Sequence, residues 1–276
     1  MIFLLFCYTT GHMLEYSILG IVQGVFEWLP VSSEGIIVLV RTHFFANTSL
    51  IDTIHLALFL HLGTVLAALV YFRKDIQRLL YSLFQFKTAS LEDKKTISFI
   101  FISTLITGVI GILLSLFIKE NEILIDSYTT LITLGIGVLL LITGVLLSLE
   151  KYLISEREVS DITHLDSILL GFVQAMAALP GLSRSGLTVS ALLLRKFNKE
   201  DALRLSFLMS IPVVLGGNIL LNISNPLFSP ESFVALVFSF GFGLLTIHGL
   251  LKIAERIHFG YFVLLFGVLT IAAGLL

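Results

Sequence analysis

The sequence predicts an all-α polytopic membrane protein with an inverted-topology repeat, in which each repeat is a re-entrant helical hairpin followed by three transmembrane helices. Three observations lead to this fold class. Hydrophobic residues make up 57% of the chain and charged residues only 13%, whereas a soluble domain carries about a quarter charged residues. The mean hydropathy is +1.01. In addition, long apolar runs recur along the chain, and one polar, glycine-containing motif occurs twice.

The repeated motif predicts the two hairpins. GIVQGVFEWLPVSSEG, at residues 20–35, returns without a gap as GFVQAMAALPGLSRSG, at residues 171–186. Both copies consist of an apolar helical run, a proline, a serine-rich polar stretch, a glycine and a second apolar run. Neither run reaches the roughly 20 apolar residues that span a bilayer, so each copy predicts a helix broken inside the membrane. The identical pairs are Gly20/Gly171, Val22/Val173, Gln23/Gln174, Ser32/Ser183 and Gly35/Gly186.

Six full spans follow, three after each hairpin, and the only long polar loop, from residue 73 to 95, comes after the first of them. We expect the spans at residues 53–72, 96–118, 129–149, 202–221, 232–251 and 259–276. The chain, 1–276, is then one integral-membrane domain, with repeat one at about 14–150 and repeat two at about 165–276. Residues 1–12 lack the basic start and small-residue cleavage site of a signal peptide.

Lysine and arginine residues predict the orientation, because short cytoplasmic loops carry their excess. All but three of the 17 fall on one side when the spans alternate. Arg41 and Lys119 fall on the other side, and Arg184 lies inside the second hairpin. The first hairpin should therefore open outward and the second toward the cytoplasm, so that the two polar stretches meet near the middle of the bilayer. A net charge of −2 gives no indication of a nucleic-acid partner.

Each polar stretch precedes a fresh apolar run and so lies at a helix N-terminus, where unpaired amides carry partial positive charge. Together with Arg184 and Thr188, the hydroxyl groups of both stretches predict a cradle for an anion, and phosphate suits it best. These hydroxyls belong to Ser32, Ser33, Ser183 and Ser185. Taken alone, any one of these serines is equally well explained as a helix cap. Arg184, costly at about 2.5–3.5 kcal/mol in a bilayer centre, either grips phosphate or only pairs with Glu27 or Glu34.

Glu27 and Glu34 flank the first proline and leave several roles open: metal ligand, acid or base, or salt bridge to Arg184. Arg184 and two helix ends supply roughly +2, whereas a diphosphate near −3 with two carboxylates totals about −5. A divalent cation or a protonated glutamate is therefore required if such a ligand binds. His61 lies inside the first span, where a packing histidine is slightly favoured over a catalytic one.

The motifs EWLPVSSEG and PGLSRSG, with NKEDALRLSFLMSIPVVLGG after the second, resemble the bacitracin-resistance family of undecaprenyl-pyrophosphate phosphatases, from about Leu14 onward. The resemblance implies a prokaryotic plasma-membrane hydrolase that converts a polyprenyl pyrophosphate to the monophosphate and recycles the carrier of cell-wall synthesis. It further implies an outward-facing site and a divalent cation, Mg²⁺ or Ca²⁺. A homodimer is left open.

Carried over by motif position, Ser33 is the nucleophile, Glu27 the essential carboxylate and Arg184 the residue that holds the pyrophosphate. The implied metal ligands are Glu27 and Glu34. The implied substrate-binding residues are Ser32, Gln174, Ser183, Ser185, Gly186 and Thr188.

Two departures from the family pattern stand out. Gln23 replaces the usual opening glutamate, and Ile36 replaces the histidine that normally follows the glycine of the first motif. General acid–base help is worth roughly 10²–10⁴ in rate, so its source in this chain is open: Glu34, His61 or His43. The rival interpretation is a family member that binds or transports a lipid pyrophosphate without hydrolysing it. An unrelated transporter does not explain the intact PGLSRSG.

Overall fold

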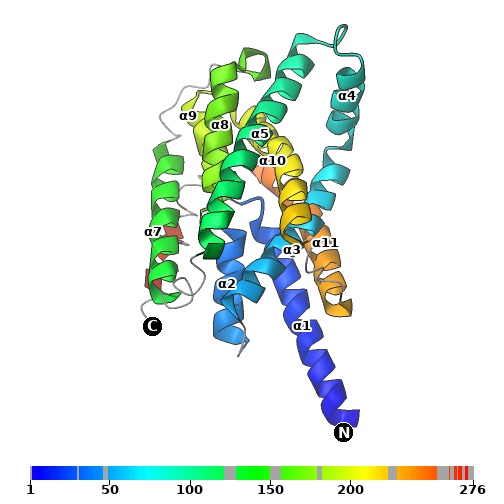
Figure 1. Ribbon diagram of the computed structural model, residues 1–276, viewed down its shortest axis with the longest axis vertical. Coiled ribbons are helices and arrows are strands. Elements are labelled where there is room, and N and C mark those ends of the chain that lie inside the picture. Colours follow the sequence, from blue (N-terminus) through cyan, green and yellow to red (C-terminus); the bar gives the residue numbers. More distant parts are fainter. Residues whose placement is uncertain are drawn as a thin grey trace.

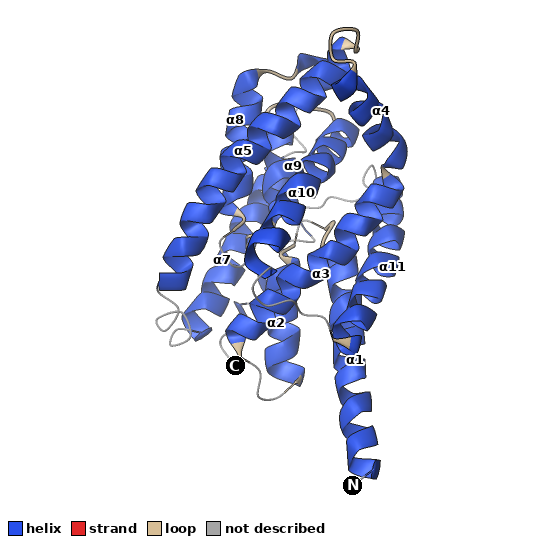
Figure 2. Cartoon of the chain, turned by 45° about the vertical axis from the view of Figure 1, so that its right-hand side comes forward, coloured by secondary structure: helices blue, strands red, loops and turns tan. Residues whose placement is uncertain are grey.

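The computed structural model describes residues 2–29, 31–45, 49–120, 129–149, 157–178, 182–222 and 229–253, with short pieces between 261 and 272. Its helices in chain order are α1 (Ile2–Phe26), α2 (Ser33–Phe44), α3 (Leu50–Tyr71), α4 (Arg73–Phe84), α5 (Leu91–Glu120), α7 (Thr129–Ser148), the short 3₁₀ helix η2 (Val159–Asp161), α8 (His164–Met176), α9 (Arg184–Leu194), α10 (Lys199–Asn222) and α11 (Pro230–Ile253). They form an elongated bundle, with the N-terminus at one end and α4 toward the other (Figures 1 and 2).

Four helices of the described residues are long and apolar enough to cross a membrane: Asp52–Tyr71, Leu91–Leu114, Glu200–Leu220 and Pro230–Lys252. They coincide with the first, second, fourth and fifth predicted spans, and α7 coincides with the third. The protein is therefore a multi-pass membrane protein. The sixth predicted span falls largely outside the described residues.

Both predicted helix breaks are present, and in each of them the corresponding serine of the motif caps the helix that follows. Ser32 caps α2, its Oγ accepting a hydrogen bond from the Gly35 amide at 3.1 Å. Ser183 caps α9 in the same way, accepting from the Gly186 amide at 3.0 Å. Serine is favoured at this position because its oxygen pairs with an amide that the helix itself leaves free. Figure 1 shows the α1–α2 hairpin in the lower half of the molecule and the α8–α9 hairpin in the upper half.

Each hairpin packs against a helix from the other half of the chain, and a glycine allows the close contact in both cases. Gly20 lets α1 approach α11 so closely that a Cβ would collide with the Ala235 carbonyl oxygen. Gly171 lets α8 approach α5, where a Cβ would lie 2.8 Å from the Cβ of Ile106. Each hairpin therefore packs on a span of the opposite half. A two-fold relation between the complete repeats stays a prediction, because it involves the last span.

The predicted polar loop at residues 73–95 is wrong at both ends, because Arg73–Phe84 form helix α4 and helix α5 begins at Leu91. Its charge suggested a loop, but its apolar residues recur at helical spacing. Leu79 is buried and Ile76 packs beside it, while Asp75 and Arg78 form ion pairs with residues of neighbouring helices. The chain thus continues beyond α3 as a second, amphipathic helix.

A buried carboxylate near the start of each hairpin pairs with an arginine near the hairpin's end. Glu15 Oε1 accepts from Arg41 Nε at 2.8 Å. Asp166 accepts from Arg195 Nε at 2.7 Å and from Arg157 Nη2 at 2.6 Å. Glu15 and Asp166 are separated by the same 151 residues as the two motifs, so the correspondence extends beyond the repeated stretch. These ion pairs hold together the two helices of each hairpin.

Replacing Asp166 with asparagine is expected to destabilise the protein, by about 3 kcal/mol at pH 7, because two arginines lose their buried partner. Burial alone raises the pKa of the Asp166 carboxyl, but hydrogen bonds from Arg157, Thr163 and Arg195 outweigh it and hold the pKa below its ordinary value. The ionised carboxylate therefore stabilises the fold above the unfolded-state pKa of about 4, and this contribution declines as the pH falls below it.

Thermal unfolding of the purified protein in detergent, at pH 7 and at pH 3, measures this effect. The difference between wild type and Asp166→Asn should shrink at the lower pH. Asp52→Asn, a change at an exposed aspartate, is the matched control and should have a small effect at both. An equal Asp166→Asn difference at both pH values contradicts the assignment.

Candidate active site

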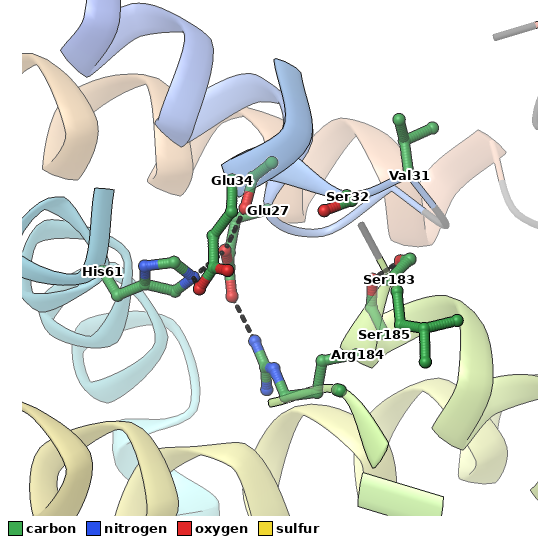
Figure 3. Close-up of a pocket in the computed structure, with 11 residues that line it drawn as sticks. Glu27, Val31, Ser32, Glu34, His61, Ser183, Arg184 and Ser185 are labelled. Atoms are coloured by element: carbon green, nitrogen blue, oxygen red, sulfur yellow. Dashed lines mark hydrogen bonds and ion pairs between the residues drawn. The ribbon is translucent and has the colours of Figure 1, made fainter. Parts of the chain in front are cut away.

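Glu27 is the centre of a polar cluster in the break between α1 and α2 (Figure 3). Its Oε2 accepts hydrogen bonds from Gln23 Nε2 at 2.8 Å and from Ser33 Oγ at 2.9 Å. The Nε2 atom of His61 lies 3.1 Å from the same oxygen. Its Oε1 accepts from the Arg184 guanidinium. One buried carboxylate thus joins residues of α1, α2, α3 and α9.

The two helix breaks face each other across a small cavity. Ser185 Oγ donates to the Leu29 carbonyl at 2.8 Å and lies 3.3 Å from Ser183 Oγ, which ties the second break to the first. The cavity is lined by Glu27, Val31, Ser32, Ser33, Glu34, His61, Ala177, Leu182, Ser183, Arg184 and Ser185. The structure therefore brings together the two serine-rich stretches that the repeat placed at the same depth.

The cavity measures about 30 Å³, enough for about two water molecules. The cavity is partly open to its surroundings and is not sealed off. Arg184 and Glu27 face each other across the cavity (Figure 3). An anion in the cavity would therefore compete with the Glu27 carboxylate for Arg184.

The N-termini of α2 and α9 both point into this space, because Ser33, Glu34, Arg184 and Ser185 belong to their first turns and line the cavity. Each end contributes unpaired amides and about half a positive charge. One guanidinium Nη1 of Arg184 is also buried without a hydrogen-bond partner among the described residues. The site thus offers a cation and two helix ends to a negatively charged group.

Three of the predicted substrate-binding residues do not line the cavity. Gln174 is buried and its Nε2 donates to Thr107 Oγ1 at 3.3 Å. The Gly186 amide donates to the capping oxygen of Ser183. Thr188 Oγ1 donates to the Arg184 carbonyl at 2.8 Å, which fixes the first turn of α9. Their direct contact with substrate stays a prediction. The contacts of Gly186 and Thr188 stabilise the first turn of α9, which carries Arg184.

His61 lines the cavity beside Glu27, whereas the sequence slightly favoured a packing role for it. It is 8% exposed, and its Nδ1 lies 2.7 Å from the Ala57 carbonyl oxygen. Because carbonyl and carboxylate oxygens only accept hydrogen bonds, both ring nitrogens carry protons. Nδ1 donates to the Ala57 carbonyl and Nε2 donates to Glu27, with Glu34 3.9 Å away. An ionisable residue inside an apolar span is a functional candidate by default, and that signal was visible in the sequence.

His43 and Ile36 lie away from the cavity. His43 is exposed on α2, with its Nδ1 3.1 Å from the Leu39 carbonyl oxygen. Ile36 packs with Val31 and Leu140 in a buried apolar cluster. Among the histidines considered from the sequence, only His61 lines the cavity.

The cavity contains oxygen atoms of the kind that bind hard divalent cations. These are the carboxylate oxygens of Glu27 and Glu34, and Glu34 receives no hydrogen bond from another described residue. No group of three or more histidine, cysteine or acidic side chains forms a complete metal site within the described part of the chain. Glu27 and Glu34 could supply only some of the ligands of such a cation, and its binding here stays a prediction.

Comparison with known proteins agrees with the motifs. Residues 16–272 match the family model described as bacitracin resistance protein BacA. The undecaprenyl-diphosphatase of Methanococcoides burtonii is 44% identical over 263 residues, which cover 93% of this chain and 96% of that protein. That of Haloarcula marismortui is 39% identical, over 94% and 96% of the two chains.

A bacterial relative is similar over a shorter stretch. Undecaprenyl-diphosphatase 2 of Halalkalibacterium halodurans is 37% identical over 213 residues, which cover 75% of this chain and 73% of that protein. The resemblance inferred from EWLPVSSEG and PGLSRSG is thus confirmed over nearly the whole length of the chain. We conclude that the chain belongs to the bacitracin resistance protein BacA family.

Proposed function

We propose that this protein hydrolyses undecaprenyl diphosphate to undecaprenyl phosphate and inorganic phosphate. The observation that carries the proposal is the Ser33 hydroxyl, which donates to the buried Glu27 carboxylate at 2.9 Å beside Arg184 and two helix N-termini. A hydroxyl in hydrogen-bond contact with a base is the arrangement of an activated nucleophile. The names of the relatives support the same reaction.

Binding begins with an exchange of partners at Arg184. A phosphate oxygen of the substrate replaces Glu27 Oε1 on the guanidinium and reaches the buried Nη1 that lacks a partner among the described residues. The amides at the starts of α2 and α9 add further donors. The exchange leaves Glu27 facing Ser33.

Ser33 Oγ then attacks the terminal phosphorus while its proton passes to Glu27 Oε2. The new Oγ–P bond replaces the bond from phosphorus to the bridging oxygen, and undecaprenyl phosphate leaves. Water attacks the phosphoserine, the P–Oγ bond breaks, and Glu27 returns the proton to Oγ as dihydrogen phosphate departs. Arg184 and the helix ends bear the charge that develops on the transferred group.

A divalent cation, Mg²⁺ or Ca²⁺, held by Glu34 and Glu27 together with the substrate, supplies positive charge that offsets the diphosphate when it is bound. We further propose that the protein lies in a prokaryotic plasma membrane with this site open to the outside, because the basic residues gather at the opposite side of the predicted topology. There it recycles the lipid carrier of cell-wall synthesis and confers bacitracin resistance.

Removal of divalent cations is expected to abolish phosphate release from undecaprenyl diphosphate by the purified protein in detergent. Release is measured with Mg²⁺, with Ca²⁺ and with a chelator. Glu34→Gln should raise the Mg²⁺ concentration for half-maximal rate by roughly tenfold, because it removes one charged ligand. Glu200→Gln, at an exposed glutamate of α10, is the control and should leave that concentration unchanged.

Two results count against this scheme. Phosphate release that persists in the presence of the chelator would show that the reaction needs no divalent cation. Lipid binding without any release under all conditions favours the rival interpretation of a carrier that kept the phosphate cradle without the hydrolytic reaction.

A further inference from the structure

Glu27 sits where no helix fixes its side chain. It follows the last residue of α1, and its backbone amide makes one final helical hydrogen bond, to the Gln23 carbonyl at 3.0 Å. The direction of its carboxylate is therefore set by side-chain partners. Oε1 is held by Arg184, and Oε2 faces Gln23, Ser33 and His61.

Substrate binding removes one of these partners. If phosphate takes over Arg184, as the proposed function requires, Oε1 loses the guanidinium, and the side chains that still contact the carboxylate are those around Oε2. Ser33 is the group that reacts, so it cannot also be the anchor. Gln23 and His61 are left to keep Oε2 within reach of the Ser33 hydroxyl.

The His61 ring is the better fixed of the two. Its Nδ1 donates to the Ala57 carbonyl, one turn earlier on α3, at 2.7 Å. This bond prevents the ring from turning over and aims Nε2 at Glu27, 3.1 Å away. The α3 helix itself is held by packing against α10 and α11. Because α3 fixes His61, the contact from Nε2 holds the Glu27 carboxylate at a defined position.

We propose that His61 is a positioning residue for Glu27, completing an array Ser33–Glu27–His61 in which nucleophile, base and orienting group come from three different segments. This inference rests on the proposed function, because it assigns His61 to the base of that reaction. Glu27 lies between Ser33 and His61 in this array. His61 therefore affects the reaction only by holding the Glu27 carboxylate in place. A misplacement of about 1 Å in such a group costs roughly 10²-fold in rate.

The test compares His61→Leu with His61→Gln in the purified protein. Leucine removes the donor to Glu27, so kcat for phosphate release should fall roughly 10²-fold with little change in KM. Glutamine keeps an N–H donor and should retain kcat within about tenfold of wild type. His43→Leu, at the exposed histidine of α2 outside the cavity, is the control and should match wild type.

Two further readouts separate positioning from a purely structural role. Thermal unfolding should give similar midpoints for His61→Gln and wild type. Single-turnover trapping of phosphate on Ser33 should be slowed in His61→Leu at unchanged lipid affinity. A folded His61→Leu protein with wild-type kcat, or a folded His61→Gln protein without activity, overturns the proposal.

If leucine prevents folding, the glutamine variant alone decides. A wild-type protein that releases no phosphate overturns the proposed function together with this inference. Normal release by wild type and by a folded His61→Leu variant overturns the inference alone.

Discussion

Arg184→Ala is expected to abolish phosphate release, with a loss of roughly 10³-fold or more, the scale on which arginines act in phosphoryl transfer. Arg184 lines the cavity and is the first residue of α9, whose N-terminus points into the cavity. Without it, the negative charge that develops on the transferred phosphoryl group has only the helix ends to stabilise it. Arg184→Lys should recover part of the rate, because it restores a point charge without the planar fork of donors.

The measurement is phosphate release from undecaprenyl diphosphate, with thermal unfolding recorded alongside. The alanine change leaves a buried Glu27 without its ion-pair partner, so some loss of stability is expected. Arg73→Ala, at an exposed arginine of α4, controls for the loss of a positive charge elsewhere and should retain full activity. A folded Arg184→Ala protein that releases phosphate at the wild-type rate removes the centre of the proposed mechanism.

Ser33→Ala is expected to reduce release by roughly 10³-fold or more, because the activated nucleophile is lost, while Ser32→Ala should reduce it far less. The two serines are adjacent but have different contacts. Ser33 Oγ donates to Glu27, whereas Ser32 Oγ accepts from the Gly35 amide as the cap of α2. Loss of a serine cap costs about 1 kcal/mol of stability.

The pair of variants therefore separates chemistry from stability. Ser33→Ala should keep its unfolding midpoint and lose its rate, and Ser32→Ala should lose some stability and keep most of its rate. Incubation with labelled undecaprenyl diphosphate, followed by a rapid acid quench, should trap label on wild type and on Ser32→Ala. Label on Ser33→Ala identifies another side chain as the nucleophile, and full release without label on any of the proteins identifies water as the attacking group.

Much of the site was predictable because its signals are local in the sequence. Ser32 and Ser183 are each followed three residues later by glycine, and each precedes an apolar run, so a capped helix start could be expected from a few adjacent residues. The repetition of the motif then placed the two starts opposite each other. The ion pair of Glu27 with Arg184 was one of the alternatives left open.

The rest depends on packing that no local pattern reports. His61 lies on α3, outside the repeated motif. It reaches Glu27 only because α3 packs beside the break between α1 and α2. Gln174 repeats Gln23 in sequence but faces Thr107 on α5 instead of the cavity. The helical spacing of α4 was present in the sequence, but its charge was given more weight than its periodicity.

The exchanged packing of the hairpins has a consequence for ancestry. Gly20 packs on α11 and Gly171 on α5, so in a half-length chain one helix of the hairpin would lack the helix that it contacts most closely. Association of two copies would supply it, as in a swapped homodimer. At the offset of 151, Glu27 corresponds to Ala178 and Ser33 to Arg184. After duplication and fusion, one copy would thus carry the base and the nucleophile, and the other would carry the arginine. Identical subunits could not have different residues at these equivalent positions.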